Sequence, residues 1–421
     1  MKKLTLILAT LFSSASLMAK DYVLTDFGVK NDSTKLQTEA IQKVIDRAEA
    51  DGGGRIVVPA GTFLSGALFF KPGTALHLEK GACIKGSDEI SNFPLIPSRM
   101  EGRSIYYYAA LINAYQVDGF SITGAGTVNG NGLRYWKQFW NLRKERRKEG
   151  RSCTNLEVHR PRLVFLWGCD NLRLDGPTFC NSPFWTIHLY ECNNIEIANC
   201  NITAPREPVR APSSDAIDLD VCSDVHIHDC YLNCDDDGVC LKGGKGVLAG
   251  QLPENGMVKN VLVERCVFGS NLHGALTLGS ECIHASNIVL KDCQVATGSA
   301  LLRLKMRPDT YQIYENISVK NVTGYCGSVI DMKPWTQFFD LEGRDVKPFG
   351  QVRNILIENV DVECQSLGII SGNPLDTVEN VKLKDVTVKA SRPGFECIYP
   401  EVKLENVTMN GDIVINPADG R

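Results

Sequence analysis

The chain has 421 residues, 22% of them charged and 43% hydrophobic, a composition typical of a globular protein with enough apolar material for a large core. Its formal charge of −4, which becomes −6 without the first 19 residues and their two lysines, argues against nucleic acid as a partner. No later segment reaches the roughly 18 apolar residues of a spanning helix, so we expect no membrane anchor.

The N-terminus has the layout of a secretory signal peptide, predicted here over residues 1–19. Lys2 and Lys3 precede an apolar run, and small residues follow up to Ala19. We therefore predict an exported protein, periplasmic or extracellular and of bacterial type, whose mature chain spans residues 20–421.

An amphipathic helix is predicted near the start of the mature chain. Polar capping candidates at 31–33 precede apolar residues on one helical face, and glycines at 52–54 end the pattern. The apolar residues of that face are Leu36, Ala40, Ile41, Val44, Ile45 and Ala48. Within a cap of about residues 20–60, such a helix would cover the open end of a following core.

A basic island follows at 133–151, with eight Lys or Arg against two Glu. It has two interpretations. It is a solvated helix or loop, or it attracts an acidic polymer.

A seven-residue pattern recurs through the second half of the chain. It reads Asn or Asp, aliphatic, any, aliphatic, any, any, small apolar, and it starts at Asn194, Asp224, Asn260, Asn287, Asn316, Asn354 and Asn380. The alternation predicts half-buried strands. Strands that recur in this way, with few helix-length patterns between them, predict the coils of a parallel β-helix.

The cysteines follow this repeat. Four of them hold its seventh position, where later units carry valine: Cys200, Cys230, Cys266 and Cys293. Cysteine in place of valine is typical of a small buried hydrophobe, and side chains stacked in parallel fit disulfide geometry poorly. We therefore expect mostly reduced thiols, although sixteen cysteines in an exported protein would ordinarily suggest disulfides.

A second strand recurs in the same coils, with aliphatic residues two apart, at 185–190, 215–220, 237–242 and 301–305. Alignment of the inward aliphatic residues places Asp215 beside Asp237 of the next coil. Both aspartates have inward parity, so we expect them where each strand begins at a bend.

The outer face of these strands gathers further polar side chains. Alternation predicts that Asp236, Arg303 and Lys305 point outward, and the register of residues 273–279 puts His273 over Asp236. Long connections after Thr203 and after Lys242 are expected to border the same patch and to shape a binding surface.

These stretches resemble the four signatures of glycoside hydrolase family 28, the polygalacturonases, in the same order. DAIDLD, CDDDG, LHGALTLGS and LRLK stand where the family has Asn-Thr-Asp, Asp-Asp, Gly-His-Gly and Arg-Ile-Lys. The resemblance covers nearly the whole mature chain. It implies an all-β fold, a right-handed parallel β-helix of the pectin-lyase type, as a single catalytic domain over residues 20–421.

Three of the four signatures depart from the family pattern. Ser213 and Ser214 replace Asn-Thr, which can alter sugar contacts beside Asp215. Leu272 replaces the first Gly of Gly-His-Gly. Asp235 stands where Gly or Gln is usual, and we interpret it as a solvated side chain.

The resemblance also assigns roles. Asp236 is expected to be the general acid, with Asp215 and Asp237 as the base pair that holds the attacking water, so that hydrolysis inverts the sugar. His273 is expected to tune or orient the acid. This chemistry needs no metal or other cofactor, so none is expected.

Arg303 and Lys305 are expected to bind a galacturonate carboxylate, since a guanidinium fork beside a point charge suits that group. The implied substrate is α-linked galacturonic acid in pectin, as homogalacturonan or rhamnogalacturonan. Exo release of single units is favoured because the long connections can close one end of a cleft.

Two other functions stay open. In the first, the protein is a pectate lyase on a similar β-helix, with the aspartates as calcium ligands. In the second, the solenoid binds pectin without catalysis. Trp335 is either a sugar platform or packing beneath a loop. Arg206 and Arg210 are interpreted as solvated side chains, with substrate contact as the alternative.

Overall fold

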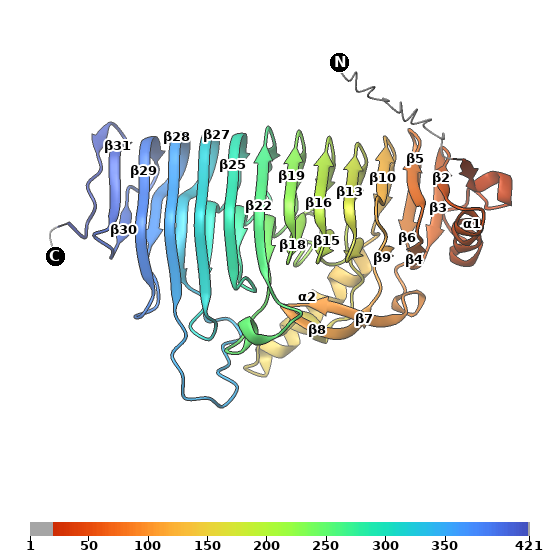
Figure 1. Cartoon of the computed structure of the whole chain (residues 1–421), viewed down its shortest axis with the longest axis horizontal. Coiled ribbons are helices and arrows are strands. Elements are labelled where there is room, and N and C mark those ends of the chain that lie inside the picture. Colours follow the sequence, from red (N-terminus) through yellow and green to blue (C-terminus); the bar gives the residue numbers. More distant parts are fainter. Residues whose placement is uncertain (1–19, 420–421) are drawn as a thin grey trace, which may run out of the picture.

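The computed structural model describes residues 20–419, so the predicted signal peptide lies outside the described residues. Within them, strands stack as successive coils along one long axis, with α1 (Thr38–Ala50) and β31 (Val402–Met409) at opposite ends of the stack (Figure 1). Each coil pairs in parallel with the next, which is the predicted parallel β-helix. No helix between residues 20 and 419 combines the length and hydrophobicity needed to cross a membrane.

Three rows of strands form the sides of the coils. The first row runs through β1 (Asp21–Val23), β2 (Gly54–Val58), β5 (Thr74–Leu78), β10 (Ser121–Gly124), β13 (Asp170–Asp175), β16 (Asn193–Ala198), β19 (Ser223–His228) and β22 (Met257–Glu264). The second runs through β3 (Gly61–Ser65), β6 (Ala82–Gly86), β11 (Thr127–Asn129), β14 (Thr178–Cys180), β17 (Asn201–Thr203), β20 (Tyr231–Asn233) and β23 (Val267–Phe268). The third runs through β4 (Leu68–Phe70), β9 (Ile112–Tyr115), β12 (Val164–Trp167), β15 (Ile187–Tyr190), β18 (Ile217–Asp220), β21 (Asp237–Lys242), β24 (Gly274–Leu278) and β26 (Ala300–Met306).

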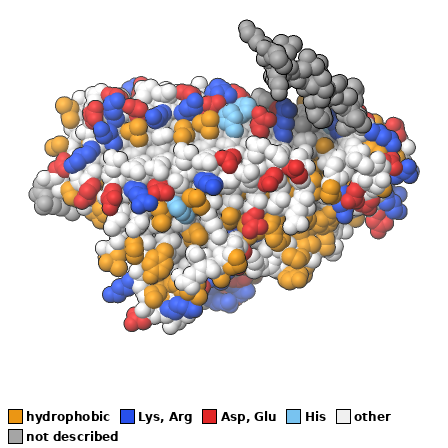
Figure 2. Space-filling model, viewed as in Figure 1, with side chains coloured by type: hydrophobic (Ala, Val, Ile, Leu, Met, Phe, Trp, Pro, Cys, Tyr) orange, Lys and Arg blue, Asp and Glu red, His pale blue; other side chains and the backbone are white. Residues whose placement is uncertain are grey.

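Toward the C-terminus the strands lengthen and span more than one row. These strands are β25 (His284–Ala296), β27 (Gln312–Pro334), β28 (Gly350–Ile370), β29 (Thr377–Ala390) and β31 (Val402–Met409), whereas the three-residue β30 (Phe395–Cys397) continues the third row. A short antiparallel strand, β32 (Asp412–Ile413), pairs with β31. Acidic and basic side chains are interspersed over the face shown in Figure 2, without the single-sign stripe of a nucleic-acid binder.

The Asn or Asp that opens each repeat has a structural reason. Asn194, Asn260 and Asn354 all have φ of 55–56°, a left-handed conformation that Asn and Asp tolerate better than other side chains. Their amides also bond along the stack, as when Asn260 Nδ2 donates to Asp224 Oδ1 at 2.8 Å. The repeat therefore encodes a bend and a ladder as well as a strand.

The repeat also builds the core. Ile288, Ile317 and Ile355 pair in successive coils and are buried. The prediction that cysteine and valine occupy the same position of successive coils is confirmed, because Cys293 pairs with Val322 of the next coil. All sixteen cysteines are free thiols in the structure.

The predicted cap helix is α1 (Thr38–Ala50), at the N-terminal end of the stack (Figure 1). Its buried face consists of Ile41, Val44, Ile45 and Ala48. Two details of the prediction were wrong. Leu36 is 42% exposed because it precedes the helix. The polar residues at 31–33 do not cap α1, and Asn31 Oδ1 instead accepts a hydrogen bond from Thr62 N of β3.

Irregular segments and short elements cover one side of the solenoid (Figure 1). They include the antiparallel hairpin of β7 (Leu95–Met100) and β8 (Arg103–Tyr108), the helix α2 (Leu133–Lys148), the connection between β21 and β22, and the connection between β27 and β28. The basic island forms α2, whose apolar residues Tyr135, Trp136 and Phe139 are buried. This helix therefore packs against the molecule and is not merely solvated.

Candidate active site

The third row of strands carries the predicted site residues, in the predicted register. Ile217 pairs with Val239, Val239 with Leu276, and Leu276 with Leu302. Asp215, Asp236 and His273 therefore lie at the starts of neighbouring strands, and Arg303 and Lys305 lie on the next one.

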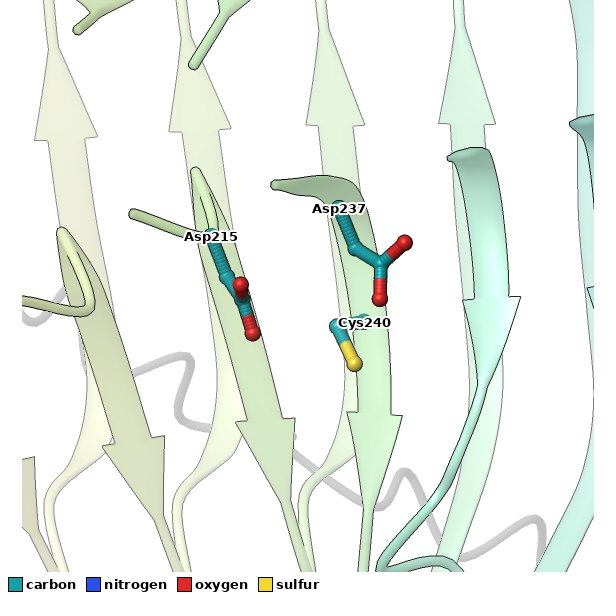
Figure 3. Close-up of side chains that lie close together, drawn as sticks. All are labelled: Asp215, Asp237 and Cys240. Atoms are coloured by element: carbon teal, nitrogen blue, oxygen red, sulfur yellow. The ribbon is translucent and has the colours of Figure 1, made fainter. Parts of the chain in front are cut away.

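Asp215 and Asp237 come from adjacent coils and point to the same side (Figure 3). One carboxylate oxygen of each, and the Cys240 sulfur, lie within 4.8 Å of one another. A single water fits between two acceptors at this separation, because each hydrogen bond takes about 2.8 Å. Asp237 Oδ1 is buried without a hydrogen-bond partner among the described residues, so it is free to accept one.

Asp237 is held ionised by two cations. Lys305 Nζ donates to Asp237 Oδ2 at 2.7 Å, and an Arg303 guanidinium nitrogen lies 3.6 Å from Oδ1. Burial alone would raise the pKa of Asp237, but Lys305 and Arg303 outweigh it and lower that pKa to about 2. Arg303 and Lys305 therefore stabilise the ionised Asp237 carboxylate, in addition to the contact with a substrate carboxylate that the sequence predicts.

The surroundings of Asp215 have the opposite effect on its pKa. Burial, reinforced by the charges of Asp218 and Asp236, raises its pKa well above the usual range. Burial also raises the pKa of Asp218 to about 6, against the attraction of Lys242. Two carboxylates 22 residues apart thus face each other with pKa values displaced in opposite directions.

Asp236 lies on the outer face with His273, as predicted. His273 Nδ1 is 3.3 Å from Asp236 Oδ1, and the side chains are 36% and 30% exposed. The contact with Asp236 raises the pKa of His273 above its ordinary value, although burial opposes it. Arg210 Nη2 lies 3.3 Å from the other ring nitrogen.

The interpretation of Asp235 as a solvated side chain was wrong. Its carboxylate is buried, and it accepts hydrogen bonds from Arg206 Nε at 2.7 Å and Arg210 Nε at 2.9 Å. The two arginines were likewise not simply solvated, because they pair with Asp235 across a 25- to 29-residue separation. A buried carboxylate needs such partners, and the loop before Asp215 supplies them.

A pocket surrounds these residues, walled by the covering segments. Its lining includes Glu101 of the hairpin tip, Trp140 and Arg143 of α2, and Trp335 and Phe338 of the β27–β28 connection. Trp335 therefore faces the site, with Lys305 Nζ 4.9 Å from its ring centroid. The basic helix contributes to the pocket, and Arg210 O accepts a hydrogen bond from Trp140 Nε1.

Of the two long connections, before Asp215 and after Lys242, only the first lines the pocket among the described residues. The one before Asp215 lines the pocket through Arg210, Pro212 and Ser213. Within the described residues, none of 243–256 lines it. That segment supports the hairpin instead, as when Asn255 Oδ1 accepts a hydrogen bond from Arg99 at 2.6 Å.

Sequence reasoning missed several pocket groups. Ser213, at a departure from the family pattern, donates to Asn155 Oδ1 at 2.9 Å, and Asn155 Nδ2 donates to Glu101 Oε1 at 3.1 Å. Glu281 of the pocket lining and Asp218, which is buried against Lys242, were also missed. Asp218 lies in DAIDLD with outward parity, a usable signal, whereas nothing local to the sequence marks Glu101 or Asn155.

One group of side chains in the site has the spacing of metal ligands. Asp215, Asp237 and Cys240 are grouped closely enough to share an ion. However, Lys305 Nζ already occupies Asp237 Oδ2 at 2.7 Å, and Lys242 Nζ lies 3.5 Å from Asp215 Oδ2. Two ammonium groups within this range oppose a cation electrostatically, so the residues present do not fit calcium.

Comparison with known proteins agrees with this architecture. The family model Glycosyl hydrolases family 28 matches residues 52–408. Because the match covers most of the chain, the chain belongs to this family and is a glycosidase.

Individual relatives are similar along their length. A probable polygalacturonase from Vitis vinifera is 28% identical over 94% of this chain and 81% of its own. An endo-polygalacturonase from Pectobacterium carotovorum is 24% identical over 92% of this chain and 97% of its own. An exopolygalacturonase structure from Thermotoga maritima superposes with a TM-score of 0.75 at 24% identity, covering 93% of this chain and 92% of that one.

Proposed function

We propose that this protein hydrolyses α-linked galacturonic acid in pectin, homogalacturonan or rhamnogalacturonan, with inversion. One observation carries the proposal. A carboxylate pair with room for one water, Asp215 and Asp237, lies beside Asp236 in a pocket that also holds Arg303 and Lys305. The family membership and the polygalacturonase relatives support the same substrate class.

The proposed mechanism gives each group one task. Asp236, the most exposed of the three carboxylates, protonates the leaving oxygen, and His273 orients it at 3.3 Å. Asp215 and Asp237 hold the attacking water and accept its proton from the opposite side of the sugar. Arg303 and Lys305 neutralise both Asp237 and a substrate carboxylate, which an uncharged sugar would not offer.

We also propose exo release of single units. The hairpin meets the β27–β28 connection, since Arg103 Nη2 lies 3.7 Å from Glu342 Oε1. The hairpin tip touches the connection after β21 as well, because a Cβ at Gly102 would lie 2.9 Å from Lys245 N. These contacts support a wall across one end of the pocket, whereas an endo enzyme needs a groove open at both ends.

We further infer that residues 20–421 form one catalytic domain with an N-terminal cap at about 20–60. The support is the parallel pairing that runs from β1 to β31. Export follows from the predicted signal peptide over residues 1–19. N-terminal sequencing of the protein recovered outside the cytoplasm checks the processing site.

Product analysis tests the function. Wild-type protein, Asp236→Asn and a matched Asp361→Asn control are incubated with polygalacturonate, rhamnogalacturonan and oligogalacturonides. Asp361 is exposed on β28, away from the pocket lining. We expect saturated galacturonic acid from wild type and control, and a rate lower by about 100-fold or more in Asp236→Asn, because a general acid contributes about 10²–10⁴.

Other outcomes would favour the rival functions. Unsaturated, ultraviolet-absorbing products that vanish with a chelator would indicate a lyase. Pectin binding without products, unchanged in Asp236→Asn, would indicate a binding solenoid. Mixed oligomers in place of single units would retain the hydrolase and contradict exo release.

A further inference from the structure

Lys242, the last residue of β21, has its ammonium buried among three carboxylates. Its Nζ lies 3.5 Å from Asp215 Oδ2, 3.2 Å from Asp218 Oδ1 and 3.5 Å from Glu281 Oε2. The side chain is 3% exposed, and the Trp185 ring centroid lies 4.3 Å from Nζ. A lysine is rarely buried to this extent unless its charge is paired.

The acidic partners depend on this one cation. Among the described residues, Lys242 is the only positively charged side chain within 4 Å of Asp215 or of Asp218. Both carboxylate oxygens of Asp218 are buried, and neither has a hydrogen-bond partner among residues 20–419. Glu281 shares the ammonium from the loop that follows β24.

The two members of the proposed base pair therefore have separate cations from separate strands. Lys305 of β26 contacts Asp237, and Lys242 of β21 contacts Asp215. We propose that Lys242 is a positioning residue for hydrolysis, which favours the ionised form of the Asp215 carboxylate and directs it at the water, against the opposing charge of Asp218. This inference rests on the proposed function of Asp215 as part of the base.

The charge of each neighbouring group determines whether it raises or lowers the pKa of Asp215. Burial, Asp218 and Asp236 raise the pKa of Asp215, and Lys242 lowers it. Removal of Lys242 should therefore raise this pKa further, and removal of the Asp218 charge should lower it. The other titratable or charged groups near the cluster are Asp237 and Cys240 on β21, Cys234, Glu281, Cys282, Lys245, Lys305 on β26, His188 on β15, Arg162, and Glu101 of the hairpin.

The pH dependence of kcat/KM on an oligogalacturonide tests the proposal. Activity that requires ionised Asp215 rises through its pKa, which sets the acid limb of the profile. We expect Lys242→Met to move this limb upward by about 1–3 pH units, the range for one close opposite charge. Asp218→Asn should move the limb downward, and Lys242→Arg should restore it toward wild type.

Lys259→Met is the matched control, since Lys259 is exposed on β22, and its profile should equal that of wild type. A loss of activity in Lys242→Met with an unmoved acid limb would overturn the proposal and leave a structural role. If Lys242→Met does not fold, Asp218→Asn decides alone, because an unmoved or raised limb overturns the proposal. If Asp215→Asn keeps wild-type activity, the base assignment itself fails, whatever Lys242 does.

Discussion

His273 lies between a carboxylate and a guanidinium, and its charge state depends on which dominates. Asp236 Oδ1 is 3.3 Å from Nδ1, and Arg210 Nη2 is 3.3 Å from Nε2. Because the hydrogen bond to Asp236 raises the pKa of His273 above 6.5, protonated His273 stabilises the folded state. That contribution is fully present below the unfolded pKa of about 6.5 and is lost as pH rises through the folded pKa.

We therefore expect His273→Asn to lower the free energy of unfolding more at pH 5 than at pH 8. The difference should be below about 1 kcal/mol, because the pair is partly exposed and screened by solvent. Urea unfolding at the two pH values measures it. The exposed His159→Asn serves as control, and a cost for His273→Asn that is equal or larger at pH 8 would contradict the expectation.

The β7–β8 hairpin is an element whose position depends on buried charge. Arg99 of β7 lies 3.1 Å from Asp220 of β18, and both side chains are buried. His188 Nδ1 accepts a hydrogen bond from Arg162 at 2.7 Å, and its Nε2 lies 3.5 Å from Asp220. Burial lowers the pKa of His188 to about 3, so this ring is neutral and Arg99 carries the charge that Asp220 needs.

Arg99→Met leaves the Asp220 carboxylate buried without its cation. We expect a loss of about 3–5 kcal/mol in the free energy of unfolding, the range for a broken buried pair. Because the hairpin walls the pocket, products should also shift toward longer oligomers.

Chemical denaturation and product sizing measure the two effects of Arg99→Met. Tyr106→Ala is the control, because Tyr106 is 74% exposed on the same hairpin and does not line the pocket. Equal stability of the two variants would show that the hairpin does not depend on Asp220.

The whole solenoid carries its cysteines as a ladder along the core. Buried thiols such as Cys230 and Cys266 occupy successive coils at the position that valine takes later. Burial of Cys240 and Cys282 raises the pKa of their thiols, so these groups stay protonated and unreactive in the folded state.

Alkylation under denaturing conditions without reductant should therefore label all sixteen cysteines of the purified protein. Intact mass spectrometry counts the labels. A reductant should leave the thermal unfolding midpoint unchanged, since no cross-link restrains the unfolded chain. Fewer labels, restored by reduction, would reveal disulfides and contradict the expectation.

Local periodicity made much of this molecule predictable. Alternation and the bend-forming Asn or Asp determine each coil, and coils of similar length stack in one register, so Asp215, Asp237 and His273 could be aligned by counting residues. The apolar face of α1 was readable for the same reason.

The rest required the tertiary structure. Arg99 and Asp220 are 121 residues apart, and Asn155 reaches Ser213 from 58 residues away. Such contacts depend on where the irregular covering segments pack against the solenoid, and the periodicity of the sequence does not predict that. The sequence by itself thus determined the coils and the order along the stack of the carboxylates that we propose as catalytic. Only the tertiary structure decided which cation each buried carboxylate meets, because burial and distance set that energy.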